Sequence, residues 1–276
     1  MDAALASRTA LTQLVAEEPI DLARAALAIA REEYPGLDES RWLRRLDELA
    51  VGARIGLPSD ASDDRKVGRL GVWLFREQGF AGNSEQYEDP KNSFLNEVLE
   101  HKQGIPITLS LVYLEVGRRF GLTVDGIGFP GHFLCRVQVD HGELYVDPFH
   151  RGQILGQSEL AQRWRAAVGK LPFDMASLRP ARPREILVRM LQNLLHVYRK
   201  RGDLPRALSA VDRMLLLHPD HPRGLRDRAD LYEKLGGSRA AAADLERVLE
   251  LSPAAQDKAA LEARIAALRG TVGVWN

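Results

Sequence analysis

The sequence predicts an α+β domain, with a helical N-terminal part and an antiparallel sheet, followed by an all-α repeat region. Three observations support this fold class. Apolar residues recur at helical spacing before the sheet, residues 124–147 are rich in β-branched and aromatic side chains, and the C-terminal part repeats at a fixed offset. A chain of 276 residues is long enough for two domains. We expect a core domain at 1–175, a linker at 176–184 and repeats at 185–276.

Three amphipathic helices are expected in the N-terminal part. Leu22–Ala30 and Trp42–Ala50 both carry apolar residues at helical spacing. A third apolar face, Val67–Phe75, ends at Gly79, because glycine is typical of the position after a helix. The polar run Gly82–Pro90 that follows is expected to form a loop.

Two further helices are expected between this loop and the sheet. The first carries Phe94–Leu99, and we expect Asn92 or Ser93 to cap it and Gly104 to close it. The second, Pro106–Phe120, begins with a proline, which suits the first helical position because its missing N–H is not needed there.

Three strands are expected next, at Val124–Phe129, His132–Val139 and Glu143–Val146. The polar segment Asp140-His141-Gly142 between the last two is typical of a hairpin turn, because glycine adopts positive φ without strain. This pattern predicts an antiparallel sheet.

The register of this hairpin decides which side chains share a face of the sheet. With a two-residue loop, Asp140-His141 or His141-Gly142, His132 and Asp147 lie on one face of neighbouring strands, while a three-residue loop separates them. Cys135 lies three positions after His132, on the opposite face, and is expected to be a buried small hydrophobe.

The region after the prolines at 172, 180 and 183 contains an internal repeat. The residue pairs at an offset of 34 are Tyr198 with Tyr232, Gly202 with Gly236, Ala207 with Ala241, and Pro219 with Pro253. Tyrosine fills the space between two helices, glycine relaxes the turn, alanine permits close approach and proline ends the second helix. The pattern resembles the tetratricopeptide repeat, with about two units in Val188–Pro253 and a capping helix at Ala254–Arg269. The repeats are expected either to bind an unidentified protein or peptide or to brace the first domain.

The composition excludes several classes of protein. Apolar residues make up 45% of the chain, and no apolar run approaches the ~18 residues that a membrane-spanning helix needs. The 38 basic residues balance the 38 acidic ones, which removes the electrostatic argument for nucleic-acid binding. Cys135 is the only cysteine, so neither an internal disulfide nor a thiolate zinc site is expected. The start of the chain lacks a signal-peptide pattern, so we expect a cytoplasmic protein.

The motifs that point to chemistry lie between Asn92 and Gly152. A helix, a strand with His132 and a strand leading to Asp147 follow one another there. In cysteine acyl-transfer enzymes of the papain and transglutaminase type, the thiolate sits at a helix N-terminus, a histidine on a neighbouring strand acts as base, and an aspartate on the next strand orients the imidazole. The order of elements therefore resembles a papain- or transglutaminase-like core.

The segments GIPITLS, FPGHFL and DPF narrow this resemblance. The whole chain resembles the bacterial SirB-one-like family, which joins a transglutaminase-like core to C-terminal tetratricopeptide repeats. The resemblance implies a Gly-x-Cys at the helix start and a glycine about 15 residues after the cysteine. Counting back from Gly121 places Pro106, in Gly104-Ile105-Pro106, at the nucleophile position. The usual covalent mechanism is therefore excluded, and the family, which has no established activity, leaves the function open.

Two hypotheses for function follow. The first is a non-catalytic binding, scaffold or regulatory module that acts through its core cleft and its repeats. The alternative is a hydrolase or acyl transferase in which His132 and Asp147 work with Ser110, Thr108 or a water. Further candidates for lining the cleft are Asn92, Asn96, Glu97 and Glu115. A regulator that acts through its repeats alone predicts that residues 184–276 bind the partner without the core.

No cofactor is expected from the sequence. The seven histidines lack the HxxxH or HxH spacing of common metal sites, and no glycine-rich phosphate loop is present.

Overall fold

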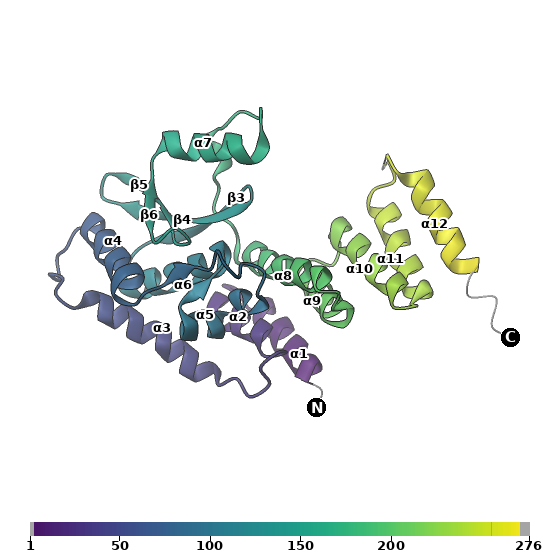
Figure 1. The fold of residues 1–276 in the computed structure, drawn as a ribbon, viewed down its shortest axis with the longest axis horizontal. Helices are drawn as coiled ribbons and strands as arrows, with labels where there is room; N and C mark the ends of the chain where they lie inside the picture. Colours follow the sequence, from purple (N-terminus) through teal and green to yellow (C-terminus); the bar gives the residue numbers. More distant parts are fainter. Residues whose placement is uncertain (1–2, 255, 271–276) are drawn as a thin grey trace. The chain divides into compact units, whose positions relative to one another are not determined.

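A computed structural model describes residues 3–254 and 256–270 of the chain (Figure 1). The chain divides into two compact units, Met1–Ile186 and Leu187–Asn276. The first unit combines helices with an antiparallel sheet and the second is helical, so the predicted fold class is confirmed.

The N-terminal helices begin where aspartate or serine side chains satisfy free backbone N–H groups. Asp21 caps the second helix, Asp38 the third and Ser62 the fourth. The helices are α1 (Ala3–Ala16), α2 (Leu22–Ala30), α3 (Glu39–Arg54) and α4 (Asp63–Gly71), which continues into a π-helical turn (Val72–Glu77). All residues of α2 except Arg24 are buried, so this helix lies inside the unit.

The segment before the central helix differs from expectation at both ends of α5 (Leu95–His101). Neither Asn92 nor Ser93 caps α5; both belong to a 3-10 helix, and the N-cap position is Phe94, which makes no side-chain cap bond. Lys102, in the left-handed conformation (φ 61°), ends the helix in place of Gly104. Gly104 instead belongs to β2 (Gln103–Gly104), which pairs in parallel with β1 (Ala81–Gly82).

The sheet follows the central helix α6 (Pro106–Phe120). Its strands are β3 (Val124–Phe129), β4 (His132–Val139), β5 (Gly142–Asp147) and β6 (Gln153–Leu155), antiparallel and paired in that order. Val139 pairs with Gly142, so Asp140-His141 is a two-residue loop, as one of the two predicted registers requires.

Helices cover both faces of this sheet, and Figure 1 shows it between α6 and α7 (Gln157–Val168). α6 packs against β3 and β4, and every residue from Pro106 to Gly117 is buried. On the α7 side the apolar cluster contains Ile127, Phe129, Leu134, Tyr145, Leu155, Leu160 and Leu178. Burying each such side chain contributes roughly 1.5–3 kcal/mol, so these two layers fix the plane of the sheet.

The second unit consists of helical hairpins. The helices are α8 (Pro183–Lys200), which begins in the first unit, then α9 (Leu204–Leu217), α10 (Pro222–Lys234), α11 (Ser238–Leu251) and α12 (Lys258–Gly270). Gly202 and Gly236 both have positive φ, at 73° and 80°, which explains glycine at the repeated turn position. Ala207 and Ala241 are fully buried, as close helix approach requires. The expected capping helix begins at Lys258 instead of Ala254.

Within residues 3–254 and 256–270, no helix combines the length and the apolar character needed to cross a membrane.

Two glycines of β3 allow a matched test of sheet packing. A Cβ at Gly126 would lie 2.8 Å from the buried Phe133 ring, whereas a Cβ at Gly128 would have no atom within 4 Å. We expect Gly126→Ala to lower the free energy of unfolding by roughly 1–3 kcal/mol because of overpacking, and Gly128→Ala to change it by less than about 0.5 kcal/mol. Urea unfolding measures both, and equal losses would show that the predicted crowding at Gly126 is wrong.

The repeats contain a buried ion-pair network with an exposed counterpart. Arg228 on α10 donates to both carboxylate oxygens of Asp244 on α11, at 2.8 and 2.7 Å, and to Asp212 on α9 at 3.1 Å. Asp244 is only 8% exposed, while Arg247 pairs with the half-exposed Asp220.

We expect Arg228→Ala to lower the free energy of unfolding by about 2 kcal/mol, because it leaves the buried Asp244 carboxylate without its guanidinium. Arg247→Ala should leave the unfolding midpoint nearly unchanged, since exposed pairs contribute little. Denaturant unfolding of the full chain gives both values, and a larger effect at Arg247 would contradict the argument.

Candidate functional site

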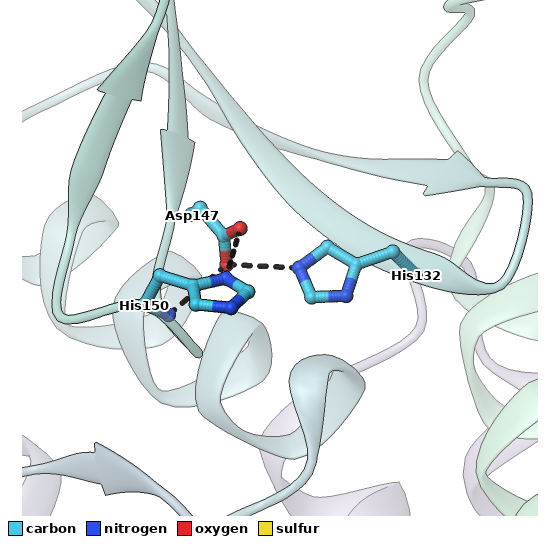
Figure 2. A group of neighbouring side chains, drawn as sticks. All are labelled: His132, Asp147 and His150. Atoms are coloured by element: carbon cyan, nitrogen blue, oxygen red, sulfur yellow. Dashed lines mark hydrogen bonds and ion pairs between the residues drawn. The ribbon is translucent and has the colours of Figure 1, made fainter. Parts of the chain in front are cut away.

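The candidate site is centred on Asp147, the last residue of β5, which is fully buried. His132, the first residue of β4, donates from Nε2 to Asp147 Oδ1 over 2.9 Å. His150 donates from Nδ1 to Asp147 Oδ2 over 2.7 Å. Figure 2 shows the two imidazole rings converging on this carboxylate. Their side chains are 17% and 51% exposed, so the cluster reaches the surface through its histidines.

The Asp147 carboxylate accepts three further hydrogen bonds. The backbone N–H groups of Phe149 and His150 donate to Oδ1 over 3.1 and 3.2 Å. Arg163 on α7 donates from Nη1 to Oδ2 over 2.5 Å, and its Nη2 donates to Gln153 over 3.0 Å. Both carboxylate oxygens are therefore surrounded by donors from three parts of the unit.

The surroundings of Asp147 keep its side chain ionised. Burial by itself raises the pKa of this carboxyl, but the hydrogen bonds and positive charge from His132, and then from His150, lower it well below its ordinary value. Asp147 therefore carries a negative charge at neutral pH.

A tight turn brings His150 back onto Asp147. The N–H of Gly152 donates to the Asp147 carbonyl over 2.8 Å, and Arg151 and Gly152 both have positive φ. A Cβ at Gly152 would lie 2.5 Å from the Phe75 ring, so glycine is required there for space as well as conformation.

The Phe149 ring packs against both histidines of the site. Its centroid lies 5.9 Å from that of His132 and 5.2 Å from that of His150, in edge-to-face arrangements. A Cβ at Gly82 would lie 2.6 Å from this ring, so the β1 backbone passes directly beside Phe149.

The hydroxyl groups proposed as substitute nucleophiles are directed at the backbone. Thr108 Oγ1 donates to the Asn92 carbonyl over 2.6 Å, and Ser110 Oγ donates to the Phe133 carbonyl over 3.3 Å. Both side chains are fully buried. Both hydroxyls thus connect α6 to neighbouring segments.

Pro106, the residue expected at the nucleophile position, and the single cysteine are also buried. Pro106 is the first residue of α6 and lies in the interior. Cys135 is fully buried on the sheet face opposite His132, and its Sγ donates to the Ser110 carbonyl over 3.4 Å. Burial raises the pKa of the Cys135 thiol, which keeps it protonated at neutral pH.

The four residues expected to line the cleft lie in two other places. Asn92 and Glu97 border a separate polar hollow of about 390 Å³. Asn92 holds the preceding loop by donating to the Gln86 and Tyr87 carbonyls. Asn96 donates to Glu97 over 3.4 Å. Glu115 is buried on α6 and pairs with Arg119 of the same helix.

Sequence reasoning missed His150 and Arg163. The segment Asp147-Pro148-Phe149-His150 carried a usable signal, because a histidine three residues after an aspartate, across a turn, can reach its carboxylate. Arg163 has no such signal in the sequence, because this residue reaches Asp147 only through the packing of α7 over the sheet.

A sequence model described as the transglutaminase-like superfamily matches residues 40–192, more than half of the chain. The chain belongs to the transglutaminase-like superfamily. A tetratricopeptide-repeat model matches residues 194–266. The order of a transglutaminase-like domain and repeats predicted from the sequence is thereby confirmed.

Individual relatives place this superfamily member in a bacterial family. A UPF0162 protein of Xylella fastidiosa (strain 9a5c) is 41% identical over 243 residues, which cover 87% of this chain and 86% of the relative. A UPF0162 protein of Pseudomonas aeruginosa is 35% identical over 248 residues, covering 89% and 90%. The F-box only protein 21 of Homo sapiens is 30% identical over 174 residues, which cover 59% of this chain but 27% of that protein. The transglutaminase-like chain therefore also belongs to the UPF0162 family.

Asp147→Asn tests the central role of the carboxylate in this transglutaminase-like domain. Hydrogen-bond donors face both oxygens of the Asp147 carboxylate, so the NH₂ group of an asparagine would have to face a donor from His132, His150 or Arg163. Arg163 would also lose the negative charge that it pairs with. We expect the free energy of unfolding to fall by about 3 kcal/mol.

Asp140→Asn in the exposed hairpin loop is the control and should change stability little. Urea unfolding compares both variants with the wild type, and a stability of Asp147→Asn equal to that of the control would refute this role.

Proposed function

We propose that this transglutaminase-like protein is a non-catalytic binding or scaffold module with a regulatory role. Pro106 carries the proposal, because this proline begins α6 at the position where the superfamily resemblance implies the nucleophilic cysteine. Proline has neither a thiol nor a hydroxyl group, so no side chain at that position can form an acyl intermediate.

The environment of the other candidate nucleophiles supports the proposal. Thr108 and Ser110 donate to backbone carbonyls inside the unit, and Cys135 is buried with a raised pKa. Activation would require one of these groups to give up its present bond and reach a base. None of these observations favours the alternative, a hydrolase or acyl transferase.

The repeats supply the proposed partner-binding half. Arg199 on α8 pairs with Asp227 on α10 over 2.5 Å, and Arg264 on α12 pairs with Asp230 on α10 over 2.6 Å. These bonds fix the stacking of successive hairpins, and such stacked repeats present an extended surface to a protein or peptide. Docking of a protein partner there is our proposal for the repeats.

The core supplies the second binding element in this proposal. His132 and His150 reach the surface above a buried carboxylate, which provides polar groups in a fixed geometry. The human F-box only protein 21 matches 59% of this chain with 27% of its own length, which supports a part of this chain that recurs as one part of a larger protein. We propose the cytoplasm as the compartment, in keeping with a single buried cysteine that forms no internal disulfide.

Reactive probes for serine and cysteine hydrolases test the non-catalytic proposal. We expect the folded wild-type chain and His132→Ala to show the same background labelling, because no activated nucleophile depends on His132. The probes are a fluorophosphonate and a thiol-directed electrophile. Mass spectrometry of the labelled peptides measures the extent of labelling.

The unfolded chain is the internal control for the thiol probe. Cys135 should react in denaturant and be slower by roughly a hundredfold or more in the folded chain, where reaction requires opening of the core. A label on the folded protein that disappears in His132→Ala would overturn the proposal in favour of an enzyme.

A further inference from the structure

The cluster of His132, Asp147 and His150 has the composition of a metal site. Each residue offers one ligand atom, and these three atoms all lie within 4.8 Å of one another. Two imidazole nitrogens and one carboxylate oxygen are donors that zinc and other divalent first-row transition metals accept in proteins. We propose that this cluster binds one such ion.

Two of the three pairs of side chains in this cluster are already in direct contact. The histidine nitrogens lie 2.9 and 2.7 Å from the carboxylate oxygens, each across one N–H hydrogen bond. A zinc ion would take the place of the two imidazole protons that now form these hydrogen bonds. With bonds of about 2.0–2.2 Å, the ion would hold its ligand atoms roughly 3.3 Å apart. All three ligand atoms lie within 4.8 Å of one another, so the widest pair would have to close by at most about 1.5 Å, and His150 is the half-exposed residue that would move.

The surroundings of Asp147 have the form of a second coordination shell. The N–H groups of Phe149 and His150, together with Arg163, hold the carboxylate in a single orientation. Such outer hydrogen bonds position ligating carboxylates in metal sites. The Phe149 ring packs against both imidazoles and limits their rotation.

Two features set the strength and form of the site. Arg163 already neutralises part of the Asp147 charge, so we expect binding in about the micromolar range, weaker than in a closed four-ligand site. Three protein ligands leave at least one coordination position for water or for an atom of a bound molecule.

This inference rests on the core half of the proposed function and names its ligand. It does not depend on the absence of catalysis, since hydrolase-directed probes and metal binding are separate measurements. If the chain binds no metal, the metal proposal fails, but the labelling test of the non-catalytic proposal is unaffected. If a probe labels the chain in a His132-dependent way, the non-catalytic proposal fails, but the test of metal binding is unaffected.

The experiment is a zinc titration of the full, untagged chain after removal of metals, in competition with a chromophoric chelator. We expect one Zn²⁺ per wild-type chain. His132→Ala and His150→Ala should each weaken binding by at least about tenfold. Co²⁺ in place of Zn²⁺ should give the visible absorption of a four- or five-coordinate ion in the wild type and lose it in both variants.

Matched controls separate this site from other histidines and from misfolding. His218 and His221 lie together in the repeat unit, with ring centroids 5.4 Å apart, and the double variant His218→Ala/His221→Ala should bind zinc like the wild type. His150 is half exposed, so His150→Ala should keep the circular dichroism spectrum of the metal-free wild type. Zinc should raise the melting temperature of the wild type and not that of His150→Ala.

Two results would overturn the inference. One is the absence of zinc binding by the wild type above the level of a His132→Ala/His150→Ala double variant. The other is stoichiometric binding that both single variants retain at wild-type strength.

Discussion

The first unit depends on keeping one ionised carboxylate, that of Asp147, in its interior. Removing such a charge from water costs several kcal/mol unless hydrogen bonds and opposite charges replace the water. The replacements come from the start of β4, from the turn after β5 and from α7. These three segments must therefore hold their relative positions. The hydrogen bonds to the buried Asp147 carboxylate also fix the orientation of the two accessible histidines.

Local chemistry made a large part of this arrangement predictable from the sequence. A two-residue hairpin loop and the alternation of side chains were enough to place His132 and Asp147 on one face. Positive φ at Gly202 and Gly236 explains why glycine recurs at an offset of 34. In each case the decisive interaction lies within a few residues or within one repeat, where sequence patterns carry most of their information.

Features set by tertiary packing were beyond prediction. Arg163 reaches Asp147 only because α7 lies over the sheet, and Asn92 holds a loop because Asn83, Gln86 and Tyr87 fold back onto it. Lys102 accepts a left-handed conformation that is usual for glycine, while Gly104 is used in the short parallel pair with β1. Such choices depend on which segments meet in space, and spacing along the chain does not encode them.

The pairing of strands in chain order keeps the histidine and carboxylate cluster within one short stretch of sequence. His132, Asp147 and His150 lie in one continuous segment, while Pro106 lies at the start of a helix that precedes the whole sheet. Substitutions at the start of α6 and substitutions within residues 132–150 therefore fall in separate stretches of the chain. The contacts between the two histidines and the carboxylate are made entirely within the later stretch.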